Sequence, residues 1–190
     1  VDMLPLFSAG ECGENSYREL IAQELGVDPQ SILGMDMYLY NRTAPSIWGA
    51  KKEFISSPKL DDLQCACTSL KAMIQAENDR CVTVYACFDN EEVGSGTKQG
   101  ASSTFLRDVL QRINDGLGFD GEDYRRAVAG SFMVSCDNAH AVHPNHPEKT
   151  DAENCTWMNK GIVIKFSANQ KYTTDGISCA VFAGLCRDAG

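Results

Sequence analysis

The sequence predicts an α/β fold in which helices cover both faces of a central sheet. Short apolar runs rich in β-branched and aromatic residues alternate along the chain with segments whose apolar residues recur every three or four positions. The length of 190 residues suffices for one such domain with its own core, and the hydrophobic fraction of 43% is ordinary for a globular protein. This alternation of strand and helix patterns is typical of layered α/β proteins.

Four segments have the apolar spacing of helices, and the expected ranges are 16–25, from 61 or 62 to 76, 102–114 and 174–186. The first begins with Ser16-Tyr-Arg-Glu19, which resembles a capping box, and Gly26 is placed to end it. Apolar residues share one face of the second and third helices and are expected to point inward: Leu63, Cys67, Leu70 and Met73, then Phe105, Val109, Leu110 and Ile113.

Four apolar runs are expected to be strands, at 35–40, 81–88, 132–136 and 161–166. The stretch 41–58 contains two prolines and a glycine and is expected to be a loop.

The overall charge indicates which partners to expect. Lys plus Arg number 17 and Asp plus Glu number 26, giving a formal charge of −9. A basic surface is needed to bind phosphates, so nucleic acid is excluded as the main partner. No run of about 18 apolar residues is present, so neither a membrane span nor a membrane partner is expected. The first seven residues lack the basic start and long apolar stretch of a signal peptide.

Cysteine usage points to a reducing compartment. The nine cysteines are odd in number, several lie in apolar runs, and none forms a CxxC pair. Cys65 and Cys67 are too closely spaced for a usual zinc knuckle. We therefore expect buried free thiols and a cytoplasmic protein.

Acidic residues occur at three boundaries between elements. Asp61 and Asp62 stand where a loop becomes a helix, Glu91 and Glu92 follow the run 81–88, and Asp137 follows 132–136. In a mostly parallel sheet these boundaries would meet at one edge, where α/β sheets bind ligands. Clustered carboxylates repel one another and need cations, so a pair of divalent metals such as zinc, cobalt or manganese is the natural partner.

Each acidic pair also has a simpler interpretation. Asp61 and Asp62 can cap a helix, and Glu91 and Glu92 can lie in a solvated turn. The glycines in 94–100 resemble a dinucleotide loop, but the last is one residue late for GxGxxG and the two glutamates would repel a pyrophosphate. We expect these glycines to let the backbone pass close to a crowded site.

All three histidines fall in one segment, at His140, His143 and His146. Their spacing matches neither HExxH nor a zinc finger. His140 or His143 is a candidate for contact with substrate or a partner subunit, and the alternative is polar packing within a loop.

Four motifs occur in order: Leu60-Asp-Asp-Leu63; Phe88-Asp-Asn-Glu-Glu-Val-Gly-Ser95 with Gly100; Ser135-Cys-Asp-Asn-Ala-His-Ala-Val-His-Pro-Asn145; and Val163-Ile-Lys165 with Asn169-Gln-Lys-Tyr172. Together they resemble the aspartyl aminopeptidases, dinuclear zinc exopeptidases that remove N-terminal Asp or Glu. The resemblance extends from about Ser16 to Ser178. It implies a three-layer α/β/α zinc-exopeptidase fold with a central mixed sheet, incomplete in this chain.

The resemblance also implies residue roles. Asp61 would bridge two zinc ions, Glu92 would bind one and Asp137 the other. Glu91 would be the general base toward a water that the metal activates, consistent with the chemistry of such sites. Lys165 would meet the acidic side chain of the substrate, and the alternative for it is a lysine at a strand end on the surface. Tyr172 and His140 complete the expected substrate contacts.

The sequence departs from the family pattern in two respects. The family uses one metal-binding histidine near its N-terminus and another near its C-terminus, and neither region is present here. Most of the inserted oligomerisation domain is also missing, so 1–15 is assigned to its tail and 16–190 to the central part of the catalytic domain. We expect this chain to be the central part of a homo-oligomeric enzyme and to be inactive alone. The alternatives are a dinuclear aminopeptidase of broader specificity and an inactive fragment.

Overall fold

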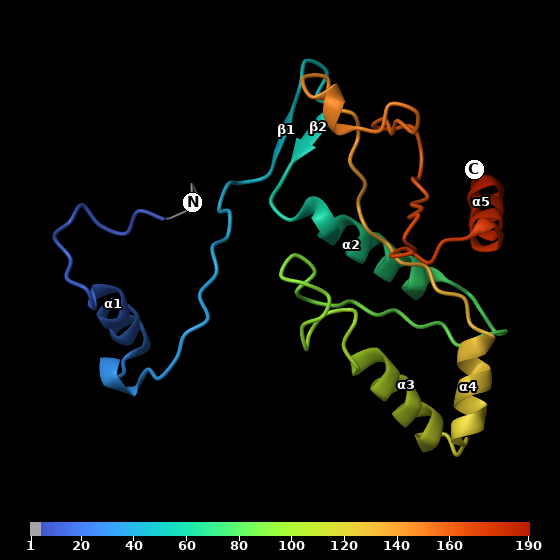
Figure 1. The fold of residues 1–190 in the computed structure, drawn as a ribbon, viewed down its shortest axis with the longest axis horizontal. Helices are drawn as coiled ribbons and strands as arrows, with labels where there is room; N and C mark the ends of the chain where they lie inside the picture. The colour runs from blue at the N-terminus through green and yellow to red at the C-terminus, as the bar shows by residue number, and fades with distance from the viewer. Residues whose placement is uncertain (1–4) are drawn as a thin grey trace. The chain divides into compact units, whose positions relative to one another are not determined.

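The computed structural model describes residues 5–190, which form two compact units that divide between Ala44 and Pro45. Figure 1 shows the elements along the chain. In chain order they are α1 (Ser16–Leu25), the 3-10 turn η1 (Pro29–Ser31), β1 (Ser46–Trp48), β2 (Phe54–Ser56), α2 (Leu60–Gln75), α3 (Phe105–Gly116), α4 (Gly121–Ala129), the 3-10 turn η2 (Pro147–Lys149) and α5 (Gly176–Ala189).

Helix α1 in the first unit has the predicted bounds. Gly26 adopts the left-handed conformation, with φ of 67°, and its N–H donates to the carbonyls of Ala22 and Gln23. This arrangement ends the helix as predicted. The predicted capping box is wrong, because Asn15 is the N-cap and no side chain makes a cap hydrogen bond.

The prediction of a loop over 41–58 is wrong, because β1 and β2 form an antiparallel hairpin there. The rings of Trp48 and Phe54 face each other across the pair and stack with centroids 4.7 Å apart. The indole Nε1 of Trp48 also donates to Ser56 Oγ at 2.7 Å. Aromatic cross-strand pairs of this kind stabilise a short hairpin, and the prolines lie outside the paired residues.

Three helices of the second unit lie close to their predicted positions. Helix α2 begins one residue before the earlier predicted start, α3 begins three residues late, and α5 continues three residues beyond the predicted end. Differences of this size are usual at helix ends, where local hydrogen bonding decides the boundary.

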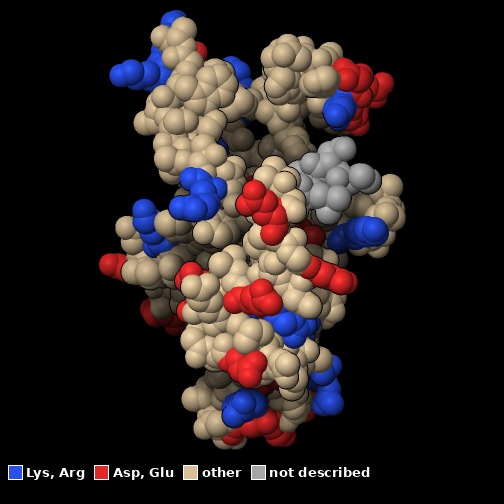
Figure 2. Space-filling model, turned by 90° about the vertical axis from the view of Figure 1, so that its left-hand side faces the viewer, with Lys and Arg blue, Asp and Glu red and all other residues tan. Residues whose placement is uncertain are grey.

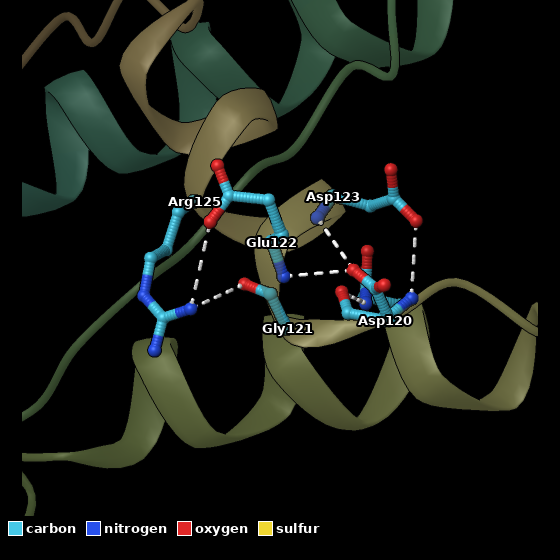
Figure 3. Close-up of polar contacts among 6 residues, drawn as sticks. Asp120, Gly121, Glu122, Asp123 and Arg125 are labelled. Atoms are coloured by element: carbon cyan, nitrogen blue, oxygen red, sulfur yellow. Dashed lines mark hydrogen bonds and ion pairs between the residues drawn. The ribbon is translucent and has the colours of Figure 1, made fainter.

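Helix α4 was not predicted, although its start has a clear sequence pattern. The Asp120 carboxylate accepts hydrogen bonds from the N–H groups of Glu122 at 2.8 Å and Asp123 at 3.0 Å, and Asp123 returns one to Asp120 N–H at 3.1 Å. Figure 3 shows this capping box, with Arg125 donating to the Gly121 carbonyl at 3.3 Å. Reciprocal capping satisfies N–H groups that the first turn leaves unpaired. Helix α4 packs against α3.

The four predicted strands do not form hydrogen-bonded strands among the residues described. The segments 35–40, 81–88, 132–136 and 161–166 have no ladder partner, and Figure 1 draws them as irregular trace. A strand is defined by pairing with a neighbour about 4.8 Å away, so a correct apolar pattern is not sufficient without that neighbour. The one sheet in the described part of the chain is β1–β2.

The predicted inward faces of α2 and α3 are largely exposed. Leu63 is 59% exposed on α2, and Phe105 is 58% exposed on α3. Among the described residues Ala22 alone is a buried hydrophobic residue. The prediction of burial therefore fails for these faces, because no sheet is formed against them.

The predictions drawn from cysteine content, charge and hydrophobicity can be compared with the structure. All nine cysteines are free thiols, as predicted, but six are exposed and three are partly buried. Figure 2 shows Lys and Arg interspersed with Asp and Glu on the visible face, without an extended region of one charge. Among residues 5–190, no helix has both the length and the apolar content needed to cross a membrane.

The Asp120 cap should make the stability of helix α4 decrease at acid pH. The N–H groups of Asp123 and then Glu122 hold the pKa of the Asp120 carboxyl below its ordinary value of 3.8. A lowered folded-state pKa means that the cap stabilises the helix fully above that ordinary value and is lost as the pH falls through the folded pKa. Asp120→Asn keeps a neutral cap and should remove this acid dependence, while Asp120→Ala should weaken α4 at every pH. Amide exchange of residues 121–125 between pH 5 and pH 2 measures both effects. Unchanged acid dependence in Asp120→Asn would contradict the assignment.

Candidate metal centre

Three carboxylates converge at the start of α2. The potential ligand oxygens of Asp61, Asp62 and Asp137 all lie within 4.8 Å of one another. Asp62 is partly buried, and the other two are exposed. The structure thus brings together Asp61 and Asp137, two of the predicted metal ligands, from segments more than 70 residues apart in the chain.

The start of α2 departs from helical geometry at both aspartates. Asp61 has φ −89° and ψ 110°, Asp62 has φ −121° and ψ 31°, and the peptide bond between them is cis. The N-cap is Lys59, and no side chain makes a cap hydrogen bond. The alternative that these aspartates cap a helix is therefore not supported, and both carboxylates remain available for other partners.

The residues at this site fit a divalent cation. Asp62 Oδ1 is buried and has no hydrogen-bond partner. A buried polar oxygen without a partner is costly, and a cation placed among the three carboxylates would satisfy it. Carboxylate oxygens suit manganese and other hard cations, and zinc also accepts them as ligands.

Lys165 places a positive charge at the edge of this cluster. Its Nζ lies 2.5 Å from Asp137 Oδ2 and donates to the backbone carbonyl of Asn138 at 2.8 Å. The Lys165 side chain is 28% exposed, so this ion pair is only partly open to water. One ammonium group cannot balance three carboxylates, so the cluster retains a net negative charge that attracts cations.

Asn138 and Cys65 connect the two segments that carry the carboxylates. Asn138 Nδ2 donates to the Leu60 carbonyl at 2.9 Å, and Cys65 Sγ lies 3.6 Å from Asn138 Oδ1. Burial is the largest influence on the Cys65 thiol and the neighbouring Asp62 carboxylate the next, and with smaller effects of Cys136 and Asp137 they raise its pKa to about 12. Cys65 is therefore a neutral thiol at ordinary pH, able to donate a weak hydrogen bond.

Glu91 and Glu92 are exposed and lie in the turn that follows 81–88. The turn is closed by hydrogen bonds from Asp89 N–H to the Gln99 carbonyl at 3.2 Å and from Gly94 N–H to the Asn90 carbonyl at 2.8 Å. Within the described residues, neither glutamate belongs to the group of converging carboxylates. Their assigned roles in catalysis and metal binding remain predictions.

The glycine-rich turn is folded on itself. A Cβ at Gly100 would overlap the Ser95 carbonyl oxygen, so glycine is required there by close backbone approach, as predicted. The N–H groups of Thr97, Gly100 and Ser102 donate to backbone carbonyls within the turn. A phosphate cradle needs free N–H groups, so this geometry does not favour a nucleotide site.

The three histidines lie in a loop outside the carboxylate cluster of the described residues. The rings of His143 and His146 are 5.7 Å apart, and His146 Nδ1 lies 3.1 Å from Glu148 Oε1. The His140 carbonyl accepts a hydrogen bond from the Thr156 hydroxyl. These contacts are consistent with polar packing in a loop and leave the predicted substrate role of His140 open, as they do that of Tyr172, which is 49% exposed.

Comparison with known proteins identifies the family. Residues 10–190 match the family described as aminopeptidase I zinc metalloprotease (M18). The chain belongs to the M18 family. It is 49% identical to a probable M18 family aminopeptidase 2 of Clostridium acetobutylicum over 93% of this chain and 41% of that protein. It is also 40% identical to aspartyl aminopeptidase 1 of Schizosaccharomyces pombe, over 80% of this chain and 33% of the other.

Solved structures of similar proteins confirm the fold class. An Ape4–Nbr1 complex contains a chain 34% identical with a TM-score of 0.77, covering 100% of this chain and 38% of the other. A dodecamer of mApe1 from S. cerevesiae is 28% identical with a TM-score of 0.69, covering 91% of this chain and 41% of the other. The predicted α/β zinc-exopeptidase fold is thus confirmed in incomplete form. The chain spans about two fifths of the length of the first M18 relatives it matches.

Two features of the site were missed from the M18 sequence pattern. Asp62 belongs to the predicted acidic cluster but receives no ligand role of its own, and Asn138 lies within the motif 135–145 but receives no role. Asp62 adjoins the predicted bridging residue and Asn138 adjoins Asp137, so adjacency to a predicted ligand was the available indication. The partners of Asn138, 73 and 78 residues away along the chain, cannot be read from spacing.

Zinc titration of this chain by calorimetry tests the site. We expect weak binding, because the converging ligands of the described residues are carboxylates without a histidine. Asp61→Asn and Asp137→Asn should each abolish measurable binding, while Asp188→Asn, a carboxylate paired with Arg187 on α5, should leave it unchanged. Tight binding of two zinc ions in the sub-micromolar range would contradict the importance of the family histidines.

Proposed function

We propose that this chain supplies the central part of a metal-dependent aminopeptidase that removes N-terminal Asp or Glu from peptides. The observation that carries the proposal is the convergence of Asp61, Asp62 and Asp137 beside Lys165, in a chain of the M18 family. An acidic site that attracts metals and a nearby cation that attracts an acidic substrate are the two components such an enzyme needs.

The proposed site holds two zinc ions, for which cobalt or manganese can substitute. Asp61 would bridge them, Glu92 would bind one and Asp137 the other. A bound zinc lowers the pKa of a water ligand and polarises the scissile carbonyl. Asp62, with its unpartnered Oδ1, supports the same site either as a further ligand or as an acceptor for a group that binds there.

Glu91 is the proposed general base. Its carboxylate would take a proton from the attacking water and return it to the amine of the leaving peptide. Its position in an exposed turn next to Glu92 leaves it free to face substrate, and no described ion pair holds it elsewhere. We propose that the Glu91 side chain moves closer to the Asp61–Asp137 cluster in the active enzyme, because a carboxylate base must lie within hydrogen-bond reach of the water it deprotonates.

Lys165 is the proposed determinant of acidic specificity. It pairs with Asp137 at 2.5 Å, and a cation bound to Asp137 would take over the charge that Lys165 now balances. The ammonium would then be available for the carboxylate of an N-terminal Asp or Glu. Tyr172 and His140 are proposed to line the same pocket.

The proposed partners are peptides with acidic N-terminal residues and further copies of the same polypeptide. The mApe1 dodecamer supports homo-oligomerisation. The proposed location is the cytoplasm, which the free thiols support, because disulfides are rare in that reducing compartment. Residues 1–15 are proposed to be the tail of an inserted oligomerisation domain and 16–190 the central part of the catalytic domain.

Two alternatives have specific support. Several relatives are described only as probable M18 aminopeptidases, which suits a dinuclear enzyme of broader specificity. Rates on Asp-anilide compared with Leu- and Lys-anilides separate this alternative from the proposal. The converging ligands are all carboxylates, which suits a chain that is inactive alone for want of histidine ligands. The metal content and intact mass of the active species test the alternative that this chain is inactive alone.

Replacement of Glu91 tests the base. In the complete enzyme, Glu91→Gln should retain the metals and reduce kcat on the order of 10²–10⁴-fold, because a general base contributes that much. Glu122→Gln, which changes an exposed glutamate paired with Arg125 on α4, is the matched control and should have no effect on kcat. Near-normal turnover by Glu91→Gln would show that the base lies elsewhere.

Replacement of Lys165 tests specificity. A charge-assisted hydrogen bond to a carboxylate contributes about 1.5–3 kcal/mol, so Lys165→Met should lower kcat/KM for an N-terminal Asp substrate by roughly 10–150-fold. An N-terminal Ala substrate, which lacks the carboxylate, should lose much less, and Lys160→Met serves as a control for loss of a lysine. Equal losses on both substrates would assign Lys165 to the cluster of Asp137 and not to specificity.

A further inference from the structure

The Asn138 side chain joins the two segments that carry the carboxylates. Its Nδ2 donates to the Leu60 carbonyl at 2.9 Å, and its Oδ1 accepts a contact from Cys65 Sγ at 3.6 Å. Both partners belong to α2, whereas Asn138 directly follows Asp137. In the part of the chain that the structure describes, these are the hydrogen bonds between α2 and residues 137–138.

The backbone of Asn138 adds a third connection. Its carbonyl accepts from Lys165 Nζ at 2.8 Å, and the same ammonium pairs with Asp137. The start of α2, the segment 137–138 and the segment 161–166 therefore meet at one residue. Among the described residues, neither 137–138 nor 161–166 is part of a sheet, so few other contacts hold these two segments in place.

The position of the bond to Leu60 matters for the cluster. The Leu60 carbonyl belongs to the peptide that leads into Asp61, so the bond from Asn138 fixes that peptide relative to Asp137. Oxygens of like charge within 4.8 Å repel, and without a clamp the two segments would separate. Holding ligands at the right separation before the cation arrives avoids an ordering cost on binding.

The chemistry of a carboxamide suits both partners. A carbonyl oxygen requires a donor, which the amide nitrogen provides, and a thiol donates to the amide oxygen on the other side. An aspartate in the same shape would place an oxygen against the Leu60 carbonyl and lose the donor. The neutral side chain also adds no further charge to a cluster that is already anionic.

We propose that Asn138 is a positioning residue for the cation site, clamping Asp137 to the amino end of α2, with Cys65 holding the other side of its carboxamide. The proposal rests on the proposed metal-binding function. It assigns Asn138 no contact with the cation itself, because its side-chain atoms are directed to Leu60 and Cys65.

Asn138→Asp gives a decisive test, because an effect of charge and an effect of the lost donor would change the zinc affinity in opposite directions. An added negative charge beside the cluster would tighten zinc binding if charge alone mattered. Loss of the donor should weaken it, and partners of this kind typically contribute 10–100-fold in metal affinity. Zinc calorimetry on this chain should therefore show 10–100-fold weaker binding for both Asn138→Asp and Asn138→Leu. Binding by Asn138→Asp that is unchanged or tighter would overturn the proposal.

The matched control is Asn154→Asp. Asn154 Nδ2 donates to Asp151 Oδ2 at 3.0 Å, so this substitution makes the same chemical change beside another carboxylate. Zinc affinity should remain that of the unaltered chain. A loss equal to that of Asn138→Asp would overturn the proposal, because it would show that an Asn→Asp change away from the clamp weakens zinc binding as well.

Cys65 provides a graded test of the second contact. Cys65→Ser retains a donor to Asn138 Oδ1 and should keep most of the zinc affinity, whereas Cys65→Ala removes the donor and should bind more weakly. Cobalt as the probe adds a spectroscopic readout, since its visible absorption reports coordination geometry. A spectrum altered by Cys65→Ala and restored by Cys65→Ser supports positioning, and identical spectra and affinities for both would overturn the role of Cys65.

A metal-free measurement separates failure of the clamp from failure of the proposed function. Hydrogen exchange of residues 60–64 should accelerate in Asn138→Leu and not in Asn154→Asp, without any metal present. Absence of zinc binding by the unaltered chain would count against the proposed function, and the clamp would then be judged by exchange alone. Unchanged exchange in Asn138→Leu would overturn the clamp.

Discussion

Mutual repulsion of three carboxylates is the constraint on which the rest of the second unit depends. Two like charges about 4 Å apart repel by roughly 1 kcal/mol in water and roughly 4 kcal/mol at the effective dielectric near a protein surface. The ligand oxygens of Asp61, Asp62 and Asp137 lie within 4.8 Å, and Lys165 supplies one opposing charge. Binding of a divalent cation among the three carboxylates would offset this repulsion.

The local structure holds this cluster with few elements. The start of α2 leaves helical geometry at both aspartates, so their carboxylates are not used in capping. Asn138 ties this start to the segment 137–138, and Lys165 bonds to both residues of that segment. These contacts hold the start of α2 close to residues 137–138. In the proposed site the three aspartates would contact the cation, and Asn138 would determine where Asp137 lies relative to α2, a division that is usual around metal sites.

The sequence predicted what depends on neighbouring residues. The helix ends at Gly26 and near Gln75 follow from local periodicity and left-handed glycine, whereas α4 was missed although Asp120 and Asp123 form a capping box three residues apart. The segment 81–88 has the apolar pattern of a strand but no ladder partner in the described structure, because pairing depends on distant chain. Asp61 and Asp137 were found from their places at element ends. Asn138 was not, because its partners on α2 are defined only after folding.

We propose that the Asp61–Asp62–Asp137 cluster binds a divalent cation. The most direct test of this binding is diffraction from zinc-soaked crystals of this chain, collected on both sides of the zinc absorption edge. We expect an anomalous difference peak among the three carboxylates, with Asp62 Oδ1 gaining a partner. An ordered cluster without a peak, or zinc bound instead at His143 and His146, would contradict it.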